Sequence, residues 1–87
     1  LELIDSSTGD AVVELAYGVF ERYQNMHIPP EKGLNQIIRS SGKPFLENHL
    51  SENIAFDYPE ITRDCSAVGG VPLIARGELF GFLWICH

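Results

Sequence analysis

Cysteine and histidine are the residue types of this sequence best suited to chemistry, as metal ligands or nucleophiles. The two cysteines and three histidines are dispersed, and only Cys86 and His87 are neighbours. Zinc sites usually take ligands from closely spaced pairs, but adjacent strand residues point to opposite faces of a sheet. The sequence also lacks the G-x-S-x-G and H-E-x-x-H motifs. We therefore predict neither a metal site nor an enzyme active site.

The polar segment 48–64 is where side chains could instead bind a small molecule. It is long and interrupted by Pro59, and such a segment between apolar elements is either a binding loop or a flexible cover. Asn, Asp and Ser would supply directional hydrogen bonds there, and Phe and Tyr would supply stacking surface. The predicted ligand-binding residues are Asn48, His49, Phe56, Asp57, Tyr58, Cys65 and Ser66. A loop without a ligand is the alternative for each of them.

Alternating apolar residues, turn clusters and one helical repeat define the elements that would position this segment. Leu34, Ile37 and Ile38 recur at helical spacing, and Gly42 followed by Pro44 is typical of a helix end. The predicted elements are strands 1–4 and 11–17, a short strand 26–28, a helix 31–41, a strand 45–47, and strands 65–73 and 79–86. A helix among antiparallel hairpins predicts an α+β fold with helices on the faces of one antiparallel sheet.

The last two strands form a predicted hairpin that turns at Arg76-Gly77. The facing pairs in that register are Phe82 with Val71, Trp84 with Gly69, and Cys86 with Ala67. Both faces are apolar, which predicts a place near the centre of the sheet with cover on each side. Cys65 then lies diagonal to Cys86, too far away for an unstrained disulfide. We therefore expect both thiols to be reduced.

Composition and charge narrow the partners and the location. The 87 residues are 45% hydrophobic and carry a net charge of −6. No two of the six Lys and Arg residues lie within three positions of each other, whereas nucleic-acid binding needs clustered cations. With no apolar run long enough to span a membrane and no secretory signal, we expect a cytoplasmic location and no binding to nucleic acid or membranes. Because the chain begins with Leu1, we expect residues 1–87 to be one partial domain cut from a longer protein.

Several short motifs, in order along the chain, resemble those of a known family. Residues 28–48, IPPEKGLNQIIRSSGKPFLEN, resemble the middle of a GAF domain. The matching positions are Ile28-Pro29, Gly33, Ile38, Ser41-Gly42-Lys43-Pro44 and Phe45. Residues 65–73 resemble the V-P-L strand of that family, and residues 77–83 resemble its glycine-containing last strand. Gln36 and Asn48 depart from the pattern, where the family usually has glycine and aspartate.

The resemblance implies a GAF-like, PAS-related sandwich, with a central antiparallel sheet flanked by helices and with the terminal helices missing. It also implies a regulatory sensor that binds a small ligand between the sheet and segment 48–64. Such domains signal to an output domain in the same chain, such as a histidine kinase of a two-component system, a cyclic-nucleotide enzyme or a transcription activator. They often dimerise, so a homodimer is expected. The resemblance names neither the ligand nor a cofactor.

Two other functions stay open from the sequence. One is a protein-interaction or dimerisation module whose pocket is filled by its own side chains, such as Trp84, Phe82 or Tyr58. The other is a thiol enzyme of the free methionine sulfoxide reductase type, which would depend on a reactive Cys65. Ligand-dependent stabilisation, self-association and turnover distinguish the three functions.

Overall fold

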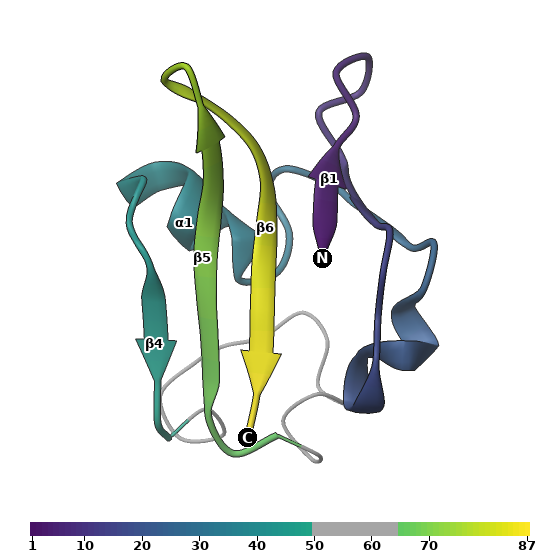
Figure 1. Ribbon diagram of the computed structural model, residues 1–87, viewed down its shortest axis with the longest axis vertical. Coiled ribbons are helices and arrows are strands. Elements are labelled where there is room, and N and C mark those ends of the chain that lie inside the picture. The colour runs from purple at the N-terminus through teal and green to yellow at the C-terminus, as the bar shows by residue number, and fades with distance from the viewer. Residues whose placement is uncertain (50–64) are drawn as a thin grey trace.

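The computed structural model describes residues 1–49 and 65–87, and these form a six-stranded antiparallel sheet with α1 against one face (Figure 1). The strand order is β3-β2-β1-β6-β5-β4, and every neighbouring pair is antiparallel. The strands are β1 (Glu2–Ile4), β2 (Ala11–Val13), β3 (His27–Ile28), β4 (Phe45–Glu47), β5 (Val68–Ala75) and β6 (Glu78–Cys86). The helices are the 3₁₀ helix η1 (Gly18–Tyr23) and the α-helix α1 (Asn35–Ser41). The predicted order of the strands and of α1 is confirmed for the described residues, whereas η1 was not predicted.

The β5–β6 hairpin is the longest element pair and turns where the sequence predicts. Arg76 and Gly77 both have positive φ angles, of 55° and 79°, as the tight two-residue turns that match strand twist require. Beyond the turn, a bulge between Leu73 and Ile74 shifts the register by one residue. The extra residue is Phe80 of β6, which interrupts the alternation of that strand and changes which residues of the hairpin face each other.

The shifted register corrects the predicted pairing of Trp84. Trp84 faces Gly70 rather than Gly69, and Phe82 faces Pro72. A Cβ atom at Gly70 would overlap the six-membered ring of Trp84. The absence of a side chain at Gly70 therefore allows the indole to lie flat over the strand.

Helix α1 begins later than the helical repeat predicts. The prediction started at residue 31, but Gly33 adopts a positive φ of 68° and the helix begins at Asn35. Its end is confirmed, because Gly42 is the left-handed C-cap and its N–H donates to the carbonyl of Ile38 at 2.7 Å. Ile38 is fully buried against Ala11 and Phe82. This contact fixes α1 on one face of the sheet.

The predicted helix-flanked sandwich is wrong. The described residues contain two short helices, seven-residue α1 and six-residue η1, so the fold is mostly antiparallel sheet. We call the face that packs on α1, with Phe82 and Trp84, the inner face. The outer face carries Leu3, Leu46, Val71, Leu73, Leu83 and Ile85. The side chains of Leu46 and Ile85 are 71% and 68% exposed. Cover was predicted on both faces of the hairpin, but the described residues cover the inner face and leave these outer-face side chains exposed.

The helices of the described residues are short. Within residues 1–49 and 65–87, neither helix has the length and apolar character needed to cross a membrane.

Candidate functional site

An apolar cavity of about 240 Å³ lies on the inner face. Strands β1, β2, β5 and β6 contribute its floor, and η1, β3 and the residues before α1 contribute its walls. Apolar side chains dominate the lining, among them Val13, Phe20, Tyr23, Met26 and Leu34. Ligand sites are usually such concave, apolar spaces with a few polar groups, although this one is smaller than their usual range of about 300–1,000 Å³.

The wall at η1 is fixed by the side chain of Gln24. Its Nε2 donates to the carbonyl of Glu14 at 2.6 Å, and its Oε1 accepts from the N–H of Ala16 at 3.0 Å. Strand β2 ends at Val13, and Glu14 and Leu15 bond to the backbone of Leu1, but the carbonyl of Glu14 and the N–H of Ala16 have no backbone partner among the described residues. Gln24 replaces that pairing and holds the segment as part of the cavity rim. The sequence analysis predicted a strand up to residue 17 and missed this role.

Three polar side chains from three different elements meet at the cavity. The indole Nε1–H of Trp84 donates to Asn35 Oδ1 at 2.8 Å, and Asn35 Nδ2 donates to Glu2 Oε1 at 2.6 Å. We call Trp84, Asn35 and Glu2 the polar row. Asn35 and Glu2 are 3% and 9% exposed, and all three residues line the cavity. The row joins β6, α1 and β1 at the place where a ligand would contact the protein.

The Glu2 carboxyl is electrostatically unusual. Burial raises its pKa above the ordinary value of 4.5, and this effect outweighs the hydrogen bond from Asn35 and the positive charges of the Leu1 amino group and Arg39. Arg39 is directed elsewhere, because its guanidinium donates to the carbonyl of Gly9 at 2.8 Å and lies over the Phe82 ring at 5.4 Å. In the described part of the chain, no basic side chain forms an ion pair with Glu2.

The residues predicted to bind a ligand lie at another place. Asn48 and His49 follow β4 and are exposed, and the N–H of His49 donates to Glu47 Oε1 at 2.9 Å. Cys65 and Ser66 precede β5 at the same end of the β4–β5 pair. None of these four residues lines the cavity, although buried Cys65 packs on Leu34 and Val68, which do. Phe56, Asp57 and Tyr58 lie outside the described residues.

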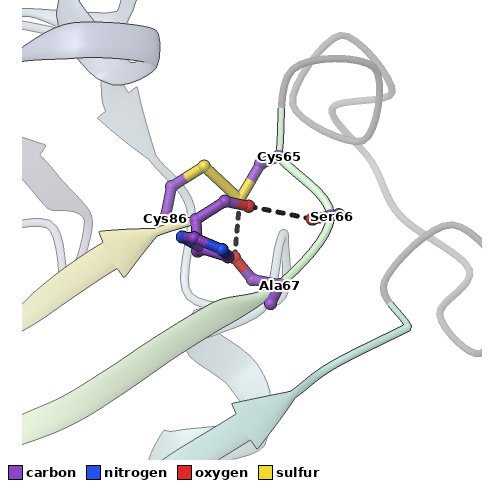
Figure 2. Close-up of a disulfide and its surroundings, with 5 residues drawn as sticks. Cys65, Ser66, Ala67 and Cys86 are labelled. Atoms are coloured by element: carbon purple, nitrogen blue, oxygen red, sulfur yellow. Dashed lines mark hydrogen bonds between the residues drawn. A yellow bond between two sulfur atoms is a disulfide. The ribbon is translucent and has the colours of Figure 1, made fainter.

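Cys65 and Cys86 form a disulfide, which corrects the expectation of reduced thiols (Figure 2). The predicted register placed the two residues diagonally, whereas the bulge moves Cys86 opposite Val68. The chain also bends at Ser66, whose N–H donates to the carbonyl of His87 at 2.9 Å. The shift alone would place Cys65 three residues from the partner of Cys86, so the bend at Ser66 is what brings the two Cα atoms to 5.6 Å, inside the range that a disulfide requires.

The polar groups at the cavity are few. They are one carboxyl, one amide, one indole N–H and the phenol groups of Tyr17 and Tyr23, in largely apolar surroundings. Across residues 1–49 and 65–87, no group of three or more His, Cys, Asp or Glu side chains is placed to hold a metal ion. The sequence analysis missed the polar row, although an asparagine next to the apolar stripe of α1 and a glutamate in an apolar strand were signals for it.

Comparison with known proteins gives no family assignment. No protein-family model matches the chain, and no curated protein matches it with significant similarity. The function is therefore inferred from the cavity and from the motifs in the sequence.

Proposed function

We propose that this chain is a non-catalytic regulatory domain that binds a small molecule in the inner-face cavity. The observation that supports this proposal most directly is the polar row, because its three polar side chains meet in a largely apolar space of about 240 Å³. Buried polar groups are costly unless they are hydrogen-bonded, and Glu2 accepts one hydrogen bond where a carboxylate can accept about four. A ligand that completes this bonding would be held firmly and in one orientation.

The GAF-like motifs of the sequence support the same function. Ile28 and Gly33, which are part of the motif in residues 28–48, lie in the cavity wall. As in the family, the proposed output is a domain elsewhere in the same protein, such as a histidine kinase, a cyclic-nucleotide enzyme or a transcription activator, in the cytoplasm. Asn48 and His49, together with Phe56, Asp57 and Tyr58, remain sequence-based candidates for further ligand contacts.

A thermal-shift screen against small metabolites tests the proposal. A ligand at about 100 times its Kd should raise the free energy of unfolding by about 2.7 kcal/mol, which in a domain of this size is a shift of roughly ten degrees or more. The shift should disappear in Ala16→Phe, which fills the cavity, and persist in Val71→Phe on the outer face. A ligand effect that survives Ala16→Phe, or a screen without any hit, would contradict the proposal.

Self-association is the second candidate function, and the outer face favours it. Leu46 and Ile85 lie on the two strands that flank Gly69 and are both paired with it, and both are largely exposed. Exposed apolar patches of this kind often mark interaction sites. The proposed partner is a second copy of the chain, as expected for a homodimer. Sedimentation velocity over a range of concentrations would show a dimer, and Leu46→Lys should weaken it.

A further inference from the structure

The polar row fixes the orientation of its own central amide, and that orientation determines what Glu2 can offer a ligand. The Trp84 indole can only donate, so Asn35 must direct Oδ1 to Trp84 and Nδ2 to Glu2. Asn35 therefore has no freedom to rotate and satisfy a ligand instead. The group left for a ligand is the second carboxyl oxygen of Glu2, Oε2, which has no hydrogen bond in the described part of the chain.

Among the described residues that line the cavity, Glu2 is the single acidic one. A buried carboxylate is stable only when a cation or several hydrogen bonds compensate it. The charges that reach Glu2 are the Leu1 amino group, at the start of β1, and Arg39 of α1. Neither forms an ion pair with it: the amino group donates to the carbonyl of Leu15 at 2.8 Å, and Arg39 donates to that of Gly9.

The rest of the cavity suits an apolar body. Phe20, Tyr23 and Trp84 present aromatic surface, and Val13, Met26 and Leu34 present aliphatic surface. Aromatic rings also attract a nearby cation through their faces. The volume of about 240 Å³ limits the ligand to a small molecule.

We infer that the cavity takes a small aliphatic or arylalkyl amine, whose ammonium group donates to Glu2 Oε2 while its apolar body packs against Phe20, Tyr23 and Leu34. This inference rests on the proposed function, since it names the ligand class of the same cavity. The ammonium supplies the positive charge that Glu2 lacks. A neutral ligand of the same shape would fill the cavity but leave the carboxylate without a counter-charge.

Three matched probes test the inference by isothermal titration calorimetry: 2-phenylethylamine, 2-phenylethanol and ethylbenzene. The wild-type protein at pH 7 should bind the amine about ten to a hundred times more tightly than the alcohol, because charge-assisted hydrogen bonds are the stronger ones. Glu2→Gln keeps the hydrogen bond from Asn35 and removes the charge, so it should abolish this preference and leave the alcohol's affinity unchanged. Glu78→Gln makes the same change at an exposed position of β6 and should change nothing.

The pH dependence provides a second readout. Affinity for the amine should rise as pH increases through the titration of Glu2, because the carboxylate is the form that binds. The other charged groups that act on Glu2 are the Leu1 amino group and Arg39. Affinity for the alcohol, and affinity of Glu2→Gln for the amine, should be flat over the same range.

The outcomes separate the inference from the proposed function. If amine and alcohol bind equally and Glu2→Gln keeps both affinities, the cavity binds ligands without recognising charge, and the inference is wrong while the proposed function stands. If all three probes fail to bind but the metabolite screen finds another ligand that Ala16→Phe excludes, the inference is again wrong and the proposed function again stands. If no small molecule binds at all, both are wrong.

Discussion

The two faces of the sheet are built from the same strands and equally apolar residues, yet they have different surroundings. On β6, Phe82 is fully buried under α1 and Trp84 lies beside the cavity, whereas Leu83 and Ile85, which alternate with them, are exposed. The inner face also holds the polar row and the disulfide, whereas the outer face carries aliphatic side chains. Alternation alone therefore does not distinguish a core from an exposed surface, and the polar groups are what distinguish the inner face, where we propose the binding site.

Removing a large side chain from each face tests this difference most strongly. Phe82→Ala should lower the free energy of unfolding by about 3–5 kcal/mol, because it leaves a cavity under α1. Ile85→Ala should lower it by less than about 1 kcal/mol, because Ile85 is already 68% exposed. Urea denaturation of both variants measures the two values. Similar losses for both variants would mean that the outer face is buried in solution.

The disulfide should give the next largest effect. Cys86→Ser should destabilise the protein by about 3 kcal/mol, since the bond closes a long loop in the unfolded chain. Wild-type protein kept in a reductant should melt at the same temperature as the variant. Ser66→Ala, next to the disulfide, is the control and should stay close to wild type. A melting temperature that does not respond to reductant would contradict the pairing of Cys65 with Cys86.

Glu2 should give a smaller effect that depends on pH. Because burial raises its pKa in the folded state, the folded protein holds the proton more tightly than the unfolded chain does. The free energy of unfolding should therefore fall as pH rises from about 4.5 through the folded-state pKa. Glu2→Gln should lack this decline and be the more stable protein at pH 7, with the difference fading below pH 4.5. Thermal melts of both proteins from pH 3 to 8 would show it, and parallel curves would contradict it.

The smallest expected effect on stability belongs to Ile85→Lys on the outer face. The side chain is exposed, so the free energy of unfolding should change by no more than about 0.5 kcal/mol. Self-association should weaken if the outer face joins two copies, because a buried lysine would lack a partner. Sedimentation velocity measures this. A dimer that tolerates the lysine would place the contact elsewhere.

Much of the secondary structure could be predicted from local signals. The Arg76-Gly77 turn and the Gly42 cap each depend on a residue type that tolerates a left-handed backbone, so their positions can be found in the sequence. The bulge after Leu73 could not be predicted, because both faces of the hairpin are apolar and a shift of one residue leaves the pattern unchanged. The pairing of Trp84 with Gly70 follows from that shift, whereas the disulfide depends on the bend of the chain at Ser66.

The candidate site was harder to predict than the elements. Glu2 and Asn35 are 33 positions apart and meet through the packing of α1 on β1, a contact that has no counterpart in local sequence. The sequence analysis instead favoured segment 48–64, where polar residues are concentrated. A single glutamate in an apolar strand is a weaker signal than a polar cluster, but its burial makes it the more informative one. The helices predicted on the faces of the sheet came from the order of elements and from the family resemblance, whereas the short helix α1 packs on the inner face.

The most direct test of ligand binding at the inner face uses the protein's single tryptophan. The indole N–H of Trp84 gives one resolved signal in a ¹H–¹⁵N NMR spectrum, and it lies in the polar row at the cavity. Titration with 2-phenylethylamine should shift this signal saturably, while the methyl signals of Ile85 and Leu46 on the outer face stay in place. An unmoved indole signal, or shifts confined to the outer-face methyls, would contradict the account of the inner face as the binding site.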